Sequence, residues 1–113
     1  MEALNSRFDE KENRWVVSVV GEIDIYNAND LKDALLSLVK EKEADLFIDC
    51  VELSFIDSTG LGSLVTVLKT VKLFGGEVIL ANVKKAIAKL FRITNLDKAF
   101  VITANTDVIT EGA

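Results

Sequence analysis

The sequence contains no histidine, no proline and a single cysteine. Without histidine, the chain lacks the usual general base of serine hydrolases and the commonest protein ligand of transition metals. Cys50 has no partner for an intramolecular disulfide, and its position in the apolar run 46–51 predicts a buried, unreactive thiol rather than a nucleophile. Because these absences argue against catalysis, we expect a protein that is not an enzyme and that uses no metal and no cofactor.

Long hydrophobic runs and a signal peptide are also missing. The longest apolar stretch, residues 61–74, contains Lys69 and Lys72 and is too short to cross a bilayer. The N-terminus has neither the basic region nor the apolar stretch of a secretory signal. We therefore expect a cytoplasmic protein with no direct membrane insertion. A chain of 113 residues, half of them hydrophobic, fits one domain over residues 1–113.

Positive charge is in short supply, because 13 basic residues stand against 18 acidic ones and give a net charge of −5. An acidic chain gains nothing from the phosphates of nucleic acids. One basic group, Lys84, Lys85, Lys89 and Arg92, has helical spacing, which is more typical of a solvated helix face than of a nucleic-acid patch. We expect no nucleic-acid partner and favour a protein partner.

Hydrophobic periodicity and turn residues predict strands that alternate with helices. We expect strands at residues 4–8, 15–20, 46–51, 77–81 and 100–103, helices beginning at Asn27, at 57–59 and at a cap on Asn82, and a terminal turn or helix over 105–110. The strand 15–20 is apolar on nearly both faces and ends at Gly21, which is typical of a central strand covered by helices. This order predicts an α/β fold with parallel crossovers, in which the first two strands form an antiparallel pair at one side.

The apolar positions of the three helices predict which side chains face the core. They are Leu31, Leu35, Leu38 and Val39 in the first helix, Leu61, Leu64, Val65, Leu68, Val71 and Leu73 in the second, and Val83, Ile87, Leu90 and Phe91 in the third. The second helix is expected to stop at Gly75 and Gly76, since glycine is common at helix ends.

Two loops at the carboxyl ends of predicted strands carry the candidate functional residues, because functional loops of parallel α/β sheets gather there. They are residues 21–27 and 55–62. Ser58 lies at or near a helix N-terminus, where it either caps the helix, as Asp57 also can, or is a modification site. Gly60 and Gly62 either allow close packing of helix on sheet or keep the surface around Ser58 clear of side chains.

Two classes of active site lack essential parts in these loops, and a magnesium site is conceivable but weakly supported. A P-loop needs Gly-x-x-x-x-Gly-Lys-Ser/Thr, which the sequence around Gly60 and Gly62 does not supply. A phospho-aspartate receiver domain is expected to show paired acids after its first strand and a lysine after its last strand, whereas Glu22 and Asp24 flank an isoleucine and the lysine is missing. Magnesium binding by Asp24 and Asp57, two carboxylates on separate loops, has only weak support.

Residues 55–62, Phe-Ile-Asp-Ser-Thr-Gly-Leu-Gly, resemble the phosphorylation-site signature of bacterial anti-sigma factor antagonists. Residues 21–24, Gly-Glu-Ile-Asp, with Asn27 and Leu31 beyond them, resemble the other loop motif of the same STAS domain family. The order, spacing and length agree from about residue 4 to residue 103. The resemblance implies the STAS fold, a mixed sheet of four to five strands packed with about four helices.

The resemblance further implies a partner-switching circuit. The unphosphorylated protein binds an anti-sigma factor that is also a GHKL-type serine kinase, and so releases a sigma factor for transcription. The kinase phosphorylates Ser58, with Thr59 as the alternative target, the antagonist dissociates, and a PP2C-type phosphatase resets it. The residues implied in partner binding are Asp24, Tyr26, Asn27, Asp57, Ser58, Thr59, Gly60 and Gly62. The alternative function is a STAS subunit that scaffolds a membrane transport system, in which Ser58 is only a helix cap.

Overall fold

The computed structural model describes residues 3–104. Its elements, in chain order, are β1 (Ala3–Asp9), β2 (Arg14–Ile23), α1 (Ala28–Glu41), β3 (Asp45–Asp49), β4 (Leu53–Ile56), α2 (Ser58–Leu73), β5 (Val78–Val83), α3 (Lys85–Ile93), the 3₁₀-helix η1 (Leu96–Lys98) and β6 (Val101–Ala104). The predicted alternation of strands and helices is confirmed, and β4 is an additional strand that the apolar pattern did not indicate. The turn or helix predicted over 105–110 lies outside the described residues.

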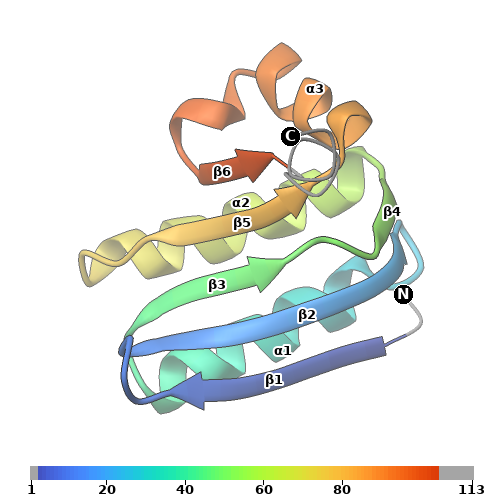
Figure 1. Ribbon diagram of the computed structural model, residues 1–113. Helices are drawn as coiled ribbons and strands as arrows, with labels where there is room; N and C mark the ends of the chain where they lie inside the picture. The colour runs from blue at the N-terminus through green and yellow to red at the C-terminus, as the bar shows by residue number, and fades with distance from the viewer. Residues whose placement is uncertain (1–2, 105–113) are drawn as a thin grey trace, which may run out of the picture.

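The strands form one mixed sheet in the order β1-β2-β3-β5-β6, with β4 paired to the end of β2 off this path (Figure 1). β1 and β2 are antiparallel, whereas every other pair is parallel. The predicted antiparallel pair at one side and the predicted parallel crossovers are both confirmed. Because the carboxyl ends of parallel strands meet at one edge, the loops that follow β2 and β4 are neighbours.

The long helices cover only one face of this sheet. In Figure 1, α1 and α2 both lie behind the sheet, and they pack against each other. β2 therefore alternates: Trp15, Val17 and Val19 are buried, whereas Val16 and Val20 on the other face are half-buried. β2 lies between β1 and β3, so the predicted central position is confirmed. Although the strand is apolar on nearly both faces, α1 and α2 cover only one of them.

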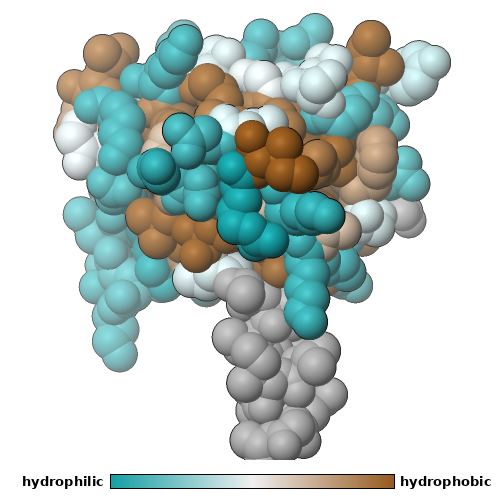
Figure 2. Space-filling model, turned by 90° about the horizontal axis from the view of Figure 1, so that it is seen from above, coloured by the Kyte–Doolittle hydropathy of each residue, from teal (hydrophilic) through white to brown (hydrophobic). Residues whose placement is uncertain are grey.

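The core lies between the sheet and the helices, and most of the positions predicted to face inward belong to it. Leu73 is an exception, with 87% of its surface exposed, because it lies about 200° around α2 from the buried Val71. Leu90 is also exposed, since the short helix α3 buries Ile87 and Phe91 and leaves Leu90 at the flank. Figure 2 looks down on the side of the molecule that carries α3 and β6, where brown apolar side chains lie between teal hydrophilic ones.

The third helix begins later than the sequence predicts. Lys84 is its N-cap residue, and Asn82 instead belongs to β5 with a φ of 58°. The Asn82 side chain donates from Nδ2 to Asp49 Oδ1 of β3 at 3.1 Å, so it joins two strands and does not cap the helix. Lys84 Nζ donates to the carbonyl oxygens of Val51 and Leu53 at 2.5 and 3.3 Å, which ties the start of α3 to the turn between β3 and β4.

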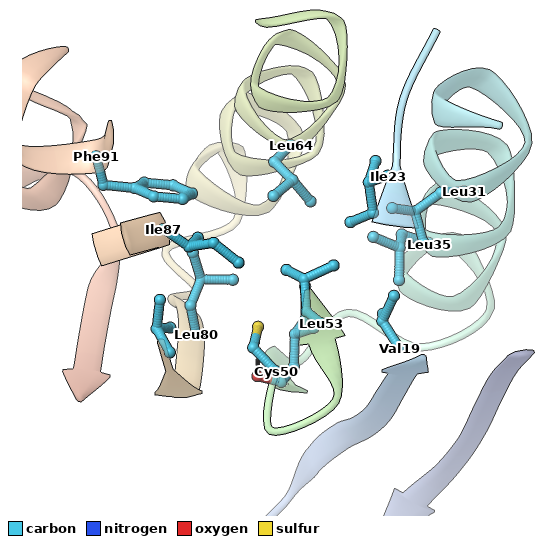
Figure 3. Close-up of a pocket in the computed structure, with 12 residues that line it drawn as sticks. Val19, Ile23, Leu31, Leu35, Cys50, Leu53, Leu64, Leu80, Ile87 and Phe91 are labelled. Carbon is cyan, nitrogen blue, oxygen red and sulfur yellow. Dashed lines mark hydrogen bonds between the residues drawn. The ribbon is translucent and has the colours of Figure 1, made fainter. Parts of the chain in front are cut away.

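A small apolar cavity of about 10 Å³ lies in the core between the sheet and the helices (Figure 3). It is lined by Val19, Ile23, Leu31, Leu35, Ile48, Cys50, Leu53, Leu64, Leu80, Val83, Ile87 and Phe91. Because it has room for about one water molecule and no polar lining, it is a packing gap and not a ligand site. Burial raises the pKa of the Cys50 thiol to about 12, with Asp49 adding to this shift and Lys84 opposing it. The prediction of a buried thiol is confirmed.

Candidate functional site

The first predicted loop motif is partly strand, because β2 bulges at Gly21 and continues to Ile23. Gly21 has a φ of 98°, a conformation that favours glycine, and the register with β4 shifts between Gly21 and Glu22. Beyond this bulge, Glu22 pairs with Phe55 and Ile23 pairs with Ile56. The prediction that Gly21 ends the strand is wrong, since the bulge redirects the end of β2 from β3 to β4.

The carboxylate of Asp57 joins the two loops that carry the candidate residues. Its Oδ1 accepts a hydrogen bond from the Gly60 N–H at 2.8 Å, which caps α2, and its Oδ2 accepts one from the Ile25 N–H at 3.1 Å. The Asp57 N–H in turn donates to the carbonyl oxygen of Ile23 at 3.2 Å. Of the two capping residues considered from the sequence, Asp57 is therefore the cap, and Ser58 is the first helical residue.

Ser58 and Thr59 are both exposed at the start of α2. Because Asp57 supplies the side-chain cap, the hydroxyl of Ser58 is not needed for that role. Backbone N–H groups in the first turn of a helix have no intrahelical partner, and they lie at the positive end of the helix dipole. An anion attached to either hydroxyl is thus placed at a favourable position of the helix.

Hydrogen bonds between the backbone and short polar side chains fix residues 24–27. The Asp24 N–H donates to Asn27 Oδ1 at 3.0 Å, and the Tyr26 N–H donates to Asp24 Oδ1 at 2.9 Å. Asn27 Nδ2 donates to the carbonyl oxygen of Glu22 at 2.9 Å. Asn27 is the N-cap residue of α1, as predicted, but its side chain turns back into the loop and makes no cap hydrogen bond.

The two glycines after Ser58 have different roles, so each of the two explanations offered from the sequence applies to one of them. A Cβ atom on Gly60 would lie 2.7 Å from Ile56 Cγ1 and 2.8 Å from Ile23 Cγ2, which means that Gly60 allows helix and sheet to pack closely. A Cβ atom on Gly62 would meet nothing within 4 Å. Packing does not require glycine at position 62, where its effect is to leave the surface near Ser58 clear.

Three large apolar side chains are exposed at the same edge of the sheet. Ile25 is 63% exposed, Tyr26 91% and Phe55 47%. Tyr26 is among the eight residues predicted to bind a partner, all of which lie in the two loops that Asp57 joins or in the first turns of α2. Sequence reasoning missed Ile25 and Phe55, because an apolar residue looks the same in sequence whether it faces the core or solvent. Their position inside the two loop motifs is the signal that could have found them.

The acidic residues of the site do not form a metal centre in this structure. No three His, Cys, Asp or Glu side chains among residues 3–104 are arranged to hold a metal ion. The carboxylates of Asp24 and Asp57, considered above as magnesium ligands, accept hydrogen bonds from backbone N–H groups instead.

The fold and the site define a small α/β domain with a surface site built from two loops at one edge of the sheet. The chain belongs to the STAS domain family, which matches residues 5–108. Over the described part of the chain, no helix has the length and the apolar character needed to cross a membrane.

Two curated relatives are both named anti-sigma-B factor antagonist. The protein of Bacillus subtilis (strain 168) is 38% identical over 104 residues, which cover 92% of this chain and 94% of the relative. A protein of Staphylococcus aureus (strain NCTC 8325 / PS 47) is 30% identical over 105 residues, which cover 93% of this chain and 97% of the relative.

The fold also matches that of solved structures. The anti-sigma factor antagonist SpoIIAA in its unphosphorylated form superposes with a TM-score of 0.71 over 97% of this chain and 96% of SpoIIAA, at 18% identity. The phosphorylated form of SpoIIAA, described as a Bacillus cell fate determinant, superposes with a TM-score of 0.69 over 98% of this chain and all of that one, again at 18% identity. The predicted STAS fold is confirmed. Residues 3–104 form six strands where four to five were expected, because β4 adds one, and three α-helices and one 3₁₀-helix where about four helices were expected.

Proposed function

We propose that this protein is an anti-sigma factor antagonist whose partner binding is controlled by phosphorylation of Ser58. In the unphosphorylated form it binds an anti-sigma factor, which is a GHKL-type serine kinase, and a sigma factor is released for transcription. The kinase transfers the γ-phosphoryl group of ATP to Ser58 Oγ, ADP leaves, and the two proteins dissociate. A PP2C-type phosphatase removes the phosphate. The protein acts in the cytoplasm, as one STAS domain over residues 1–113, by binding and not by catalysis.

The observation that supports this proposal most directly is the exposed, structurally unneeded hydroxyl of Ser58. Asp57 caps α2, so the helix keeps its cap when Ser58 is modified. The alternative function is a transport-system subunit in which Ser58 is only a helix cap. The cap hydrogen bond that Asp57 accepts argues against that role for Ser58. The relatives at 38% and 30% identity, both named anti-sigma-B factor antagonists, favour the same function.

The proposed partner-binding surface consists of the residues at this edge of the sheet, and they contribute in two ways. Tyr26, Ser58, Thr59 and Gly62 are exposed and are able to touch a partner directly. Asp24, Asn27, Asp57 and Gly60 act through the hydrogen bonds and the close packing that set the shape of the two loops.

Phosphorylation is expected to change binding and not folding. A phosphate on Ser58 adds about −1.5 to −2 charges. The helix N-terminus favours an anion by roughly 0.3–1 kcal/mol, so the domain tolerates it. In the complex, the same dianion must lose its water beside the Asp57 carboxylate. A cost of about 3 kcal/mol at that step would weaken binding more than a hundredfold.

The proposal is tested by incubating the protein with the candidate anti-sigma factor kinase and ATP, followed by intact-mass and peptide mass spectrometry. We expect one phosphate on Ser58 in the parent and in Thr59→Ala, and none in Ser58→Ala. A phosphate that stays in Ser58→Ala and disappears in Thr59→Ala would move the switch to Thr59.

A second measurement gives the consequence for binding. Calorimetric titration of the kinase with the phosphorylated protein is expected to show an affinity at least a hundredfold below that of the unphosphorylated protein. Equal affinities of the two forms would overturn the proposal. Failure of a kinase with demonstrated catalytic activity to phosphorylate this protein would also overturn it, and would favour the transport-system subunit.

A further inference from the structure

The loop over residues 24–26 is held in one conformation by an unusual set of hydrogen bonds. Three consecutive backbone N–H groups each donate to a side-chain oxygen: that of Asp24 to Asn27, that of Ile25 to Asp57 and that of Tyr26 to Asp24. The carbonyl oxygen of Asp24 accepts from the N–H groups of Asn27 and Ala28 at 3.2 and 2.8 Å. Asp24, Asn27 and Asp57 are thus engaged with the backbone of the loop.

The side chains that this fixed loop presents to solvent are apolar. Ile25 and Tyr26 point away from the core, and Phe55 is exposed in the neighbouring strand β4, two residues before Asp57. Exposed large apolar side chains that lie together on a protein surface often mark an interaction site. Because the backbone below Ile25 and Tyr26 is already ordered, burying them against a partner costs little further conformational entropy.

We propose that Ile25, Tyr26 and Phe55, here called the apolar rim, are the residues that dock into a complementary apolar groove on the kinase that acts on Ser58. Asp24, Asn27 and Asp57 are positioning residues that hold the rim in place. This inference rests on the proposed function, and it assigns the affinity of the complex to side chains other than the acidic residues of the two loop motifs.

The position of Ser58 indicates which protein binds the apolar rim. A kinase must bring the γ-phosphate of ATP to about 3–3.5 Å from Ser58 Oγ, so the surface around its active site covers the neighbours of Ser58. Ile25 is hydrogen-bonded to the residue directly before Ser58, and Phe55 lies three positions before it on the strand that leads into α2. An enzyme that reaches Ser58 therefore covers the rim as well. Tyrosine and phenylalanine are side chains that supply much of the affinity when they are buried at the centre of an interface.

The rim and the phosphate act independently in this arrangement. The three rim side chains are uncharged and are not altered by the modification of Ser58, so they set the affinity of the unphosphorylated form. The phosphate then opposes binding, because an anion on Ser58 loses its water when the kinase covers it.

The experiment measures the dissociation constant for the candidate kinase, and kcat and KM for Ser58 phosphorylation, in Ile25→Ala, Tyr26→Ala and Phe55→Ala. We expect Tyr26→Ala and Phe55→Ala to raise the dissociation constant and KM by about 10- to 100-fold at an unchanged kcat. The matched control is Leu73→Ala, a side chain as exposed as that of Tyr26 at the other end of α2, roughly 22 Å along the helix from Ser58. It should behave as the parent protein in every measurement.

Two further variants separate positioning from direct contact at Asp24. Asp24→Ala removes the acceptor of the Tyr26 N–H, whereas Asp24→Asn keeps an oxygen in the same place and removes only the charge. We expect Asp24→Ala to weaken kinase binding at least fivefold and Asp24→Asn to restore it to within twofold of the parent. Equal losses in both variants would mean that the kinase reads the charge, and would overturn the positioning role.

The experiment distinguishes a failure of the docking role of the apolar rim from a failure of the proposed function. If the parent is phosphorylated on Ser58 and the rim variants bind as tightly as the Leu73→Ala control, the kinase docks elsewhere and the inference is wrong while the phosphoswitch stands. If the parent is not phosphorylated by an active kinase, the proposed function itself fails.

Discussion

The two edges of the sheet use the same means of holding their loops but place their aromatic side chains differently. At the edge where the parallel strands begin, Trp15 Nε1 donates to the carbonyl oxygen of Lys42 at 3.0 Å, and Asp45 Oδ1 accepts from the Glu77 N–H at 2.8 Å. The Trp15 ring packs edge-on against Phe8 at 5.1 Å between centroids. At the edge where the parallel strands end, Asp57 and Asn27 hold the loops in a similar way.

The difference lies in where the large aromatic side chains point. Trp15 is buried and Phe8 packs against the core, whereas Tyr26 and Phe55 at the other edge are exposed. Lys42 even covers the Phe8 ring, with Nζ 4.0 Å from its centroid. The edge where the strands begin is thus closed by its own aromatic residues, while the edge that carries Ser58 leaves its aromatic residues exposed to solvent.

The largest effect expected from this difference is on stability. Trp15→Ala removes a buried aromatic side chain and its hydrogen bond, and should lower the free energy of unfolding by about 3–5 kcal/mol. Tyr26→Ala removes a side chain of similar size that is exposed, and should change it by less than about 0.5 kcal/mol. Urea unfolding followed by circular dichroism checks both values. If the two variants lost comparable free energy of unfolding, the aromatic side chains at the two edges would contribute equally to stability, and the comparison would fail.

The next effect separates the two glycines of α2. Gly60→Ala places a methyl group against Ile56 and Ile23 and should cost about 1–3 kcal/mol of stability. Gly62→Ala meets no atom within 4 Å, and should stabilise the helix by about 0.5–1 kcal/mol. The same unfolding measurement applies, with the kinase assay as a second readout for Gly62→Ala. Destabilisation by Gly62→Ala would show that this surface is more crowded than the structure indicates.

A smaller effect is expected at the carboxylate that joins the two loops. Asp57→Asn has one oxygen for two N–H donors, so it keeps one of the bonds to Gly60 and Ile25 and loses the other. We expect a loss of about 0.5–2 kcal/mol, the usual cost of a lost N-cap. Amide hydrogen exchange at Ile25 should also become faster. Asp24→Asn is the control, because its single remaining oxygen serves its single donor, Tyr26.

The smallest effect belongs to the charge on Ser58. Ser58→Asp introduces an anion in the first turn of α2 and should change the free energy of unfolding by no more than about 1 kcal/mol. Thermal melts of Ser58→Asp, Ser58→Ala and the phosphorylated protein provide the measurement. A phosphorylated form that is largely unfolded at room temperature would refute a switch that acts on the binding surface alone.

Much of this architecture could be predicted from local patterns. The alternation of strands and helices, the antiparallel pair at one side and the helix that begins at Ser58 depend on periodicity and on turn residues close in sequence. Burial of Cys50 followed from the apolar run around it. These features need no knowledge of what lies across the fold, so the sequence specifies them directly.

Several of the features that escaped prediction depend on distant contacts. β4 is only four residues long and does not alternate, and it becomes a strand because the bulge at Gly21 turns β2 towards it. The position of Asn82 in β5 depends on Asp49 of the neighbouring strand. The role of Asp57 in joining two loops depends on Ile25, which is 32 residues away in the chain. No window of sequence contains both partners of such a contact.

The segment that carries Ser58 has a consequence for the order in which the chain assembles. Its attachments join residues far apart in sequence: Ile25 to Asp57 across 32 positions, and both Ser54 to Gly21 and Lys84 to Val51 across 33. Contacts of such separation form only after the entropy of closing long loops has been overcome, so they are completed late in folding. A newly made or partly denatured chain therefore contains Ser58 but not the surface around it. A partner that requires that surface is therefore expected to bind only molecules that have finished folding.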